Sequence, residues 1–236
     1  MHEDLNEKDQ EFLISLKKTL FNDSVDWTSP QKLFVTSTKK GRIIHLTWTH
    51  WGLPVNVKNW QDVYHDAMKA NLLEKVPDSI ENLEEIERIE LDCNKISELP
   101  LTFANLNKLR FLSISYNKLK EIPKEIFKLR NLEYLNLASN HLCEIPDEIT
   151  QLNKLKVLLI GDNNIKKCPD SFIRFEKLQV LDIRDWQCVP YDIEKIKSLK
   201  RIYVNKELLP FITSNSNIEI KCGKEPIIKL ILKIIT

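Results

Sequence analysis

One short pattern occurs four times between Asn94 and Pro169, and it constrains the fold of this chain more than any other feature. Each copy opens with Asn and closes with Pro, and each starts 23 residues after the copy before it. The copies are Asn94–Pro100, Asn117–Pro123, Asn140–Pro146 and Asn163–Pro169. Independent segments would not stay in register over four copies, so the pattern indicates a repeated structural unit.

Apolar residues precede each of these Asn residues at a fixed spacing. The triplets are Ile86, Ile89 and Leu91; Leu109, Leu112 and Ile114; Leu132, Leu135 and Leu137; and Leu155, Leu158 and Ile160. Their alternation with other positions is typical of a short strand with one buried face. A lone strand of this kind cannot bury that face, whereas stacked copies form one parallel sheet. We therefore predict an α/β fold, a curved horseshoe-shaped solenoid with the parallel sheet on its concave side.

The repeated Asn and Pro positions have structural explanations. An amide at the end of each strand has both donors and an acceptor, so it can satisfy backbone groups in the turns that leave the strands. We predict a ladder of such amides, formed by Asn71, Asn94, Asn117, Asn140 and Asn163. Pro suits the first turn of a helix, so short helices or 3₁₀ segments are expected on the convex side.

The complete unit, L-x-x-L-x-L-x-x-N-x-L-x-x-I-P-x-x-I-x-x-L, resembles the intracellular leucine-rich repeat proteins typified by the Ras-suppressor-like family. Residues from about 63 to 204 carry this resemblance. It implies the horseshoe fold, whereas it is nearly silent about function, because this scaffold binds many unrelated partners.

The first part of the chain is similar to the N-terminal cap of plant and some bacterial leucine-rich repeat proteins. We predict a helix over 4–22 with Phe12, Leu13, Leu16 and Leu20 on one face, then Trp27 and a strand at 33–36. The two cysteines that brace the plant cap are absent. A first repeat strand follows at 43–48, and residues 63–83 fit either a degenerate second repeat or, over 64–73, a helix. The predicted domains are an N-terminal cap at 1–42, repeats at 43–210 and a C-terminal cap at 211–236.

Two features mark the end of the repeats. Trp186 takes the Asn position of the next unit, and residues 218–220 fit a short closing strand. Residues 226–236 form the most apolar stretch of the chain, which is too short to span a bilayer. It fits a cap on the last repeat, because an open solenoid end needs covering. The other interpretation is a segment that docks on a partner or a membrane, with Lys229 and Lys233 on its polar side.

Composition excludes several classes of function. A formal net charge of +1 argues against nucleic acid as the main ligand, and with only 4 glycines no phosphate-cradling loop is available. We expect no cofactor and no small-molecule substrate. The 5 cysteines include no C-x-x-C pair, and Cys168 and Cys188 fit small buried apolar residues. Since the N-terminus lacks a signal-peptide core, we expect a cytoplasmic location, or a host-cell cytosol for a bacterial effector.

Side chains that flank the inward leucines should point out of the concave face and align in columns. One column reads His45, His65, Arg88, Phe111, Tyr134, Val157, Val180 and Arg201. Outward positions should be mostly polar, yet Phe111, Tyr134, Val157 and Val180 of this column and Leu159 of the next column are apolar. These five neighbouring residues predict an exposed apolar patch. Such a patch within a charged rim resembles a protein interface. The alternative is that the stacked side chains only stabilise the sheet.

The main hypothesis is a non-catalytic module that binds a partner protein on its concave face. The candidate binding residues are Arg88, Glu90, Phe111, Tyr134, Val157, Leu159, Val180, Asp182, Arg184 and Asp185. By analogy, the cap and the repeat class suggest a host-directed effector or a signalling scaffold, with a small GTPase as one partner. A membrane-peripheral scaffold docked through residues 226–236 is the alternative. A metal-dependent enzyme would use His45, His50 and His65, although no Cys or carboxylate completes a zinc spacing.

Overall fold

The computed structural model describes residues 5–21, 34–47, 73–212 and 218–222. Its α-helix is α1 (Glu7–Phe21). The strands are β1 (Phe34–Lys39), β2 (Arg42–Thr47), β3 (Arg88–Glu90), β4 (Phe111–Ser113), β5 (Tyr134–Asn136), β6 (Val157–Leu159), β7 (Val180–Asp182), β8 (Arg201–Val204) and β9 (Glu219–Cys222). The 3₁₀ helices are η1 (Asp78–Asn82), η2 (Leu101–Asn105), η3 (Ile126–Lys128), η4 (Asp147–Gln151), η5 (Asp170–Arg174), η6 (Ile193–Lys195) and η7 (Lys206–Phe211).

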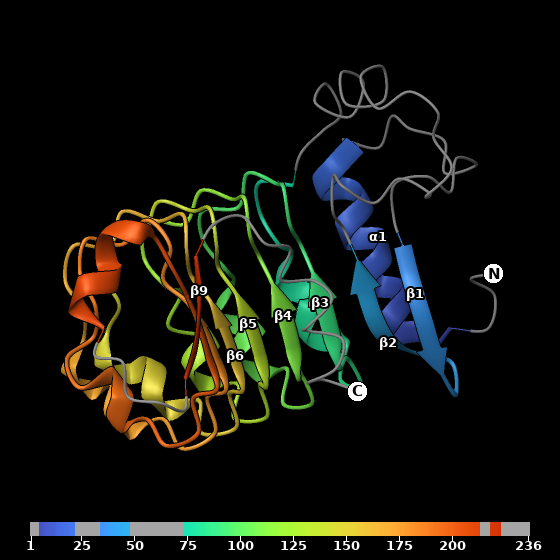
Figure 1. Ribbon diagram of the computed structural model, residues 1–236. Helices are drawn as coiled ribbons and strands as arrows, with labels where there is room; N and C mark the ends of the chain where they lie inside the picture. Colours follow the sequence, from blue (N-terminus) through green and yellow to red (C-terminus); the bar gives the residue numbers. More distant parts are fainter. Residues whose placement is uncertain (1–4, 22–33, 48–72, 213–217, 223–236) are drawn as a thin grey trace, which may run out of the picture.

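The strands form one sheet whose spatial order is the order of the sequence, from β1 to β9 (Figure 1). β1 and β2 pair antiparallel, and each pair from β2 to β9 is parallel. In the regular part, Phe111 pairs with Tyr134, which pairs with Val157. This register is the 23-residue period of the sequence, so the predicted α/β solenoid with a parallel sheet and short convex 3₁₀ segments is confirmed.

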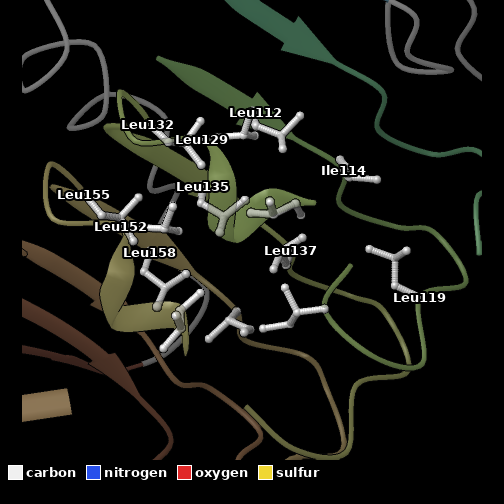
Figure 2. Close-up of a cluster of buried hydrophobic side chains, with 14 of the residues drawn as sticks. Leu112, Ile114, Leu119, Leu129, Leu132, Leu135, Leu137, Leu152, Leu155 and Leu158 are labelled. Carbon is white, nitrogen blue, oxygen red and sulfur yellow. The ribbon is translucent and has the colours of Figure 1, made fainter. Parts of the chain in front are cut away.

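The core lies between the sheet and the 3₁₀ segments. Figure 2 shows Leu112, Leu135 and Leu158, one from each of three adjacent strands, among the leucines of the intervening loops. All three are fully buried. Burying a leucine side chain contributes roughly 1.5–3 kcal/mol, and one such contribution recurs in every repeat. The stacked repeats therefore share one core, which runs from α1 to η7 within the described residues.

The Asn side chains form the predicted ladder wherever the structure describes them. The Asn117 Oδ1 atom accepts a hydrogen bond from the Ile96 amide at 2.9 Å, while Nδ2 donates to the carbonyls of Leu91 at 2.9 Å and Ser115 at 3.0 Å. Asn140 and Asn163 make the equivalent contacts, while Asn94 accepts from the Leu73 amide of the repeat before it and donates to the Leu91 carbonyl of its own turn. Asn71 lies outside the described residues. Each amide therefore joins its own turn to the repeat before it.

Trp186 replaces Asn at the end of this ladder. Its indole Nε1 donates to the Ile160 carbonyl at 3.1 Å. One repeat earlier, the Asn163 Nδ2 atom donates to the equivalent carbonyl, that of Leu137. The side chain is buried and packs near Phe172. Indole has a donor and no acceptor, so Trp186 keeps one half of the Asn role and adds apolar area to the core.

The residue before each ladder position has a left-handed backbone, which the sequence did not reveal because none of these residues is Gly. The five are Cys93, Tyr116, Ser139, Asp162 and Asp185, with φ between 53° and 62°. A non-glycine residue in this region costs roughly 1–2 kcal/mol. The turn is held by the next repeat, since the amide of Tyr116 donates to the Ala138 carbonyl at 3.0 Å, and Cys93, Ser139 and Asp162 donate likewise.

The N-terminal cap combines α1 with the β1–β2 hairpin. The predicted helix over 4–22 corresponds to α1, and Phe12, Leu13 and Leu16 are buried. The buried Asp9 carboxylate accepts hydrogen bonds from the Ile43 amide at 2.5 Å and from Arg42 Nε at 2.9 Å, which fixes the helix on the first parallel strand. Trp27 lies outside the described residues.

One part of the predicted repeat order is wrong. A strand around His65 was expected between the strands of His45 and Arg88, but β2 pairs directly with β3, with His45 opposite Arg88. The first parallel strand also belongs to the cap hairpin, whose turn has left-handed φ values at Lys40 and Gly41. Such a two-residue turn matches the twist of paired antiparallel strands, so the pair Lys40 and Gly41 was the signal for it.

The interpretation of Cys168 and Cys188 as small buried apolar residues is incomplete. Both are partly buried and packed against the core, but they also form a disulfide, with their Cα atoms 6.1 Å apart. Their separation of 20 residues falls short of the repeat period, so sequence register alone did not place them side by side. The predicted closing strand at 218–220 corresponds to β9, and the C-terminal cap call for 226–236 lies outside the described residues.

Candidate interaction surface

Two columns of outward side chains run across the concave face in the predicted register. The first holds His45, Arg88, Phe111, Tyr134, Val157, Val180 and Arg201. The second holds Thr47, Glu90, Ser113, Asn136, Leu159, Asp182 and Tyr203. His65, which was expected in the first column, lies outside the described residues.

The apolar members of these columns form a second cluster, separate from the core. This concave cluster consists of Phe111, Tyr134, Val157, Leu159, Val180 and Tyr203. The structure brings together all five apolar residues that the sequence singled out, but the expectation that they are exposed is wrong. Each side chain is at most 5% exposed. Sequence register gives the face on which a residue lies, but it does not reveal what packs over that face.

Aromatic rings account for part of this burial. The rings of Phe111 and Tyr134 stack with centroids 4.0 Å apart and planes 5° apart. The Arg88 guanidinium covers the other side of Phe111 at 3.5 Å from the ring centroid, a favourable arrangement of a cation over a ring face. At the far end of the cluster, the Arg184 guanidinium lies 5.9 Å from the Tyr203 ring. Cations therefore flank both ends of the cluster.

Each flanking arginine is held by a carboxylate two residues away. Arg88 Nε donates to Glu90 Oε1 at 2.5 Å. Arg184 donates through Nε and Nη2 to the two oxygens of the fully buried Asp182, at 2.9 and 2.6 Å. A bidentate pair fixes the plane of the guanidinium. These four residues are among the predicted binding residues, and the structure places them as two ion pairs at opposite ends of the cluster.

A carboxyl pair lies at the strand-end edge of the rim. The carboxyl groups of Asp162 and Asp185 share a hydrogen bond, which together with burial raises the pKa of Asp162 above the ordinary value. Two carboxylates this close cannot both ionise freely. The Asp185 side chain also accepts a hydrogen bond from Asn205 Nδ2 at 2.5 Å. This edge therefore carries negative charge that depends on pH.

Sequence reasoning missed two contributors to this surface. Tyr203 stands in the second column beside Asp182, so the column pattern contained the signal and its apolar ring was overlooked. The second is Asp92, one of whose oxygens accepts hydrogen bonds from Ser113 Oγ, the Ser115 amide and Ser115 Oγ at 2.6–2.7 Å. Burial still raises the pKa of Asp92, in opposition to these bonds. Asp92 thus ties β3 to the end of β4.

Chemistry other than binding has little support on this surface. Among the residues that the structure describes, no cluster of three or more His, Cys, Asp or Glu side chains could hold a metal ion. His50 and His65 of the proposed metal site lie outside those residues. Burial raises the pKa of the Cys93 thiol to about 12, so its thiolate is scarce at neutral pH. In the described part of the chain, no helix has both the length and the apolar character that a membrane crossing requires.

Comparison with known families agrees with this geometry. The model of a leucine-rich repeat region matches residues 117–216, and a second leucine-rich repeat model matches residues 68–119 and 84–142. Together with the parallel register and the Asn ladder, these matches show that the chain is a leucine-rich repeat protein. The finer assignment to the Ras-suppressor-like class stays a prediction. No curated protein matches the chain in sequence.

Solved structures show the same fold. A leucine-rich repeat protein of Leptospira interrogans is 27% identical, with a TM-score of 0.54 over 66% of this chain and 43% of its own. The matching chain in the crystal structure of PEPR1-AtPEP1 is 22% identical, with a TM-score of 0.59 over 85% of this chain and 29% of its own. The chain thus spans less than half of the length of either. Leucine-rich repeat domains are typically non-catalytic modules for protein–protein interaction, and this chain fits that class.

Proposed function

We propose that the chain binds a partner protein on its concave face, with the concave cluster at the centre of the contact and the two arginine–carboxylate pairs in its rim. The observation that carries this proposal is that the core is continuous without the cluster. The aromatic rings of Phe111, Tyr134 and Tyr203 are therefore not needed to join one repeat to the next. Aromatic anchors within a polar rim are the usual centre of a protein interface.

The alternative interpretation, that the cluster only stabilises the sheet, makes a different prediction. Cross-strand pairs contribute roughly 0.2–1 kcal/mol each, and their loss would change stability without changing what the protein binds. Central aromatic residues of an interface cost 2 kcal/mol or more when truncated, which is about 30-fold in affinity. Binding and stability must therefore be measured on the same variants.

The test is capture of partners from a cell lysate by three forms of the chain. The parent is compared with Tyr134→Lys and with Tyr191→Lys, a matched control in which the replaced aromatic residue is 75% exposed and belongs to neither cluster. The proposal predicts a protein captured by the parent and by Tyr191→Lys, and lost from Tyr134→Lys. Thermal melting must show that Tyr134→Lys is folded. Equal capture by all three forms contradicts the proposal.

The narrower roles follow from analogy and are proposed on that basis. They are a bacterial host-directed effector and a signalling scaffold with a small GTPase as partner. A panel of purified small GTPases, each loaded with GDP or GTP, tests the second role directly. Binding that depends on the nucleotide and is lost from Tyr134→Lys supports it, and a panel without any binding contradicts it.

A cytoplasmic location also stays a proposal, and the disulfide between Cys168 and Cys188 opposes it. Cytosolic reductants keep thiols reduced, whereas these two sulfur atoms are bonded. Alkylation of intact cells, followed by mass spectrometry, measures the state of the pair. Alkylated Cys168 and Cys188 support the cytoplasmic proposal. A bridged pair beside an alkylated Cys143, which is exposed and unpaired, contradicts it.

A further inference from the structure

A pocket opens on the convex side of the solenoid, where η2, η3 and η4 lie next to one another. Its volume is about 340 Å³, and pockets that hold small ligands usually measure roughly 300–1,000 Å³. It shares no residue with the concave cluster. The residues that line it are Leu101, Ala104, Lys124, Glu125, Phe127, Lys128, Glu148 and Gln151.

The apolar wall of this pocket departs from the repeat pattern. Leu101 follows the Pro of its repeat and is 70% exposed. Phe127 takes the position that Ala104 holds one repeat earlier. At the position of Leu101, the next three repeats carry charged residues, namely Lys124, Asp147 and Asp170. The repeat therefore does not require this wall, and an exposed leucine beside a pocket is a contact surface for an apolar group.

Glu125 is the polar residue that sets the chemistry of the pocket. It is only 7% exposed, and its side chain does not cap η3, which begins one residue later. From the residues that the structure describes, no hydrogen bond or ion pair reaches its carboxylate. Burial of a carboxylate without a partner is unfavourable. Because Glu125 lines the pocket, a cation bound there would supply that partner.

The neighbouring repeat adds a second acid. Glu148 follows Glu125 by one repeat period and lines the same pocket. The guanidinium of Arg130 does not neutralise either carboxylate, because it donates to the backbone and side-chain oxygens of Gln151 at 2.8 and 3.1 Å. Two carboxylates thus face a pocket whose remaining wall is largely apolar.

The opposite charge preference is the alternative, since Lys124 and Lys128 also line the pocket. Both lysines are exposed. A lysine stem carries its ammonium group into water, where salt screens the charge. The Glu125 carboxylate is held inside the pocket, and a charge interacts more strongly where water is partly excluded. The pocket therefore favours a cation over an anion.

We propose that this convex pocket binds a small organic cation, in which an ammonium group is joined to an apolar body. The ammonium group pairs with Glu125, and the apolar body lies against Leu101, Ala104 and Phe127. A bare metal ion fits less well, because no group of three or more His, Cys, Asp or Glu side chains within the described residues could hold one. The site is independent of the proposed function, which concerns the concave face.

The test is ligand-observed NMR titration of the full-length chain with three probes of similar shape. Phenethylammonium carries the positive charge, phenethyl alcohol is neutral and hydrocinnamate is negative. The parent is compared with Glu125→Gln and with Glu121→Gln, a control at an exposed acid of the same repeat that lies outside the pocket. The proposal predicts that phenethylammonium binds the parent and Glu121→Gln equally. Glu125→Gln should weaken that binding at least about tenfold, the loss of one charge-assisted hydrogen bond.

A second variant tests the apolar wall without changing any charge. Ala104→Leu fills part of the pocket, so it should also weaken phenethylammonium binding, while Glu125 is retained. Thermal melting without a probe accompanies both variants. Glu125→Gln should melt at or above the temperature of the parent, because it removes an unpaired charge. A lower melting temperature would show that the carboxylate stabilises the fold, and this would overturn the proposal.

Three binding results also overturn it. The first is parent-like binding of phenethylammonium by Glu125→Gln, which would place the probe elsewhere. The second is tighter binding of hydrocinnamate than of phenethylammonium by the parent, which would assign the pocket to anions through its lysines. The third is a parent that binds none of the three probes. None of these results bears on the capture experiment for the concave face.

Discussion

The two faces of the same sheet differ in how strictly the repeat fixes their residues. On the core side, Leu112, Leu135 and Leu158 occupy equivalent positions, and the ladder repeats Asn at four successive turns, from Asn94 to Asn163. On the concave side, the positions next to them hold Phe111, Tyr134 and Val157. Each inward residue contacts the repeats on both sides, so it must satisfy one common geometry, whereas an outward residue is free to vary with what it binds.

This difference separates scaffold from surface. The core holds a continuous cluster and a ladder of buried amides, and both extend from one repeat to the next. The concave cluster is local, confined to β4–β8, and ends at Arg88 and Arg184. We therefore expect substitutions on the core side to change stability, and substitutions on the concave side to change binding.

The largest expected effect on stability is at the ladder. Asn140→Ala removes the acceptor of the Leu119 amide and the donor to the carbonyls of Ile114 and Leu137. Each buried group left unsatisfied costs roughly 1–3 kcal/mol, so urea unfolding should show a loss of roughly 4 kcal/mol. The control is Asn136→Ala on the concave face, which loses bonds to Ser113 and the Ala138 amide and should cost about 1 kcal/mol. Equal losses of unfolding free energy in the two variants would contradict the proposed difference between the core side and the concave side of the sheet.

Two adjacent residues on β6 compare the faces more directly. Leu158 points into the core and Val157 belongs to the concave cluster. Leu158→Ala should lower the free energy of unfolding by about 3 kcal/mol, because a cavity opens between fixed repeats. Val157→Ala should cost about 1 kcal/mol, because fewer atoms are removed than in Leu158→Ala. A larger loss from Val157→Ala would show that the concave cluster is part of the structural core.

A smaller effect on stability is expected at Gly161, where a side chain of the concave face lies close to the backbone. A Cβ atom at Gly161 would lie 2.8 Å from Asp182 Oδ1, and Arg184 holds that carboxylate in place. Gly161→Ala should therefore cost about 1–2 kcal/mol through overpacking. In an Asp182→Ser background the same substitution should cost much less, since the blocking carboxylate is gone. Equal costs in both backgrounds would exclude this contact as the cause.

The smallest expected effect is a change in pH dependence. The pKa of Asp162 is raised by its hydrogen bond with Asp185, so its contribution to stability is present below the unfolded value of about 3.9 and is lost as pH rises through the folded value. Asp162→Asn should abolish that loss, leaving the variant more stable at pH 7 by up to about 0.5 kcal/mol after solvent screening. Chemical denaturation from pH 3 to pH 7 measures it. Asp147→Asn, on the convex side, is the control. An equally large change in the stability of this variant would contradict the Asp162–Asp185 hydrogen bond as the cause.

The sequence predicted those parts of the molecule that the repeat fixes. The period gave the parallel register, the Asn ladder and the column that holds Phe111, Tyr134 and Val157, because each depends only on residues 23 apart. It failed where the structure departs from the period. Cys168 and Cys188 are 20 residues apart, and the strand β2 pairs with β3 without an intervening repeat.

Burial of the concave face could not be predicted in the same way. The alternation of residues shows that Tyr134 points away from Leu135, but the packing over Tyr134 involves residues outside its own repeat. Tyr203 was missed for a simpler reason, since one aromatic residue at the end of a mostly polar column carries little signal by itself. Local periodicity thus defines the two faces, and the tertiary structure decides how each is covered.

The most direct test of the account is the affinity of the captured partner for two neighbouring variants on β5. Tyr134→Ala changes the concave cluster, whereas Leu135→Ala changes the core one residue further on. Calorimetry at a temperature where both variants are folded gives the dissociation constants. The account predicts that Tyr134→Ala weakens binding about 30-fold, while Leu135→Ala, although less stable, binds like the parent. Parent-like binding by Tyr134→Ala would contradict the assignment of the concave cluster as the binding surface.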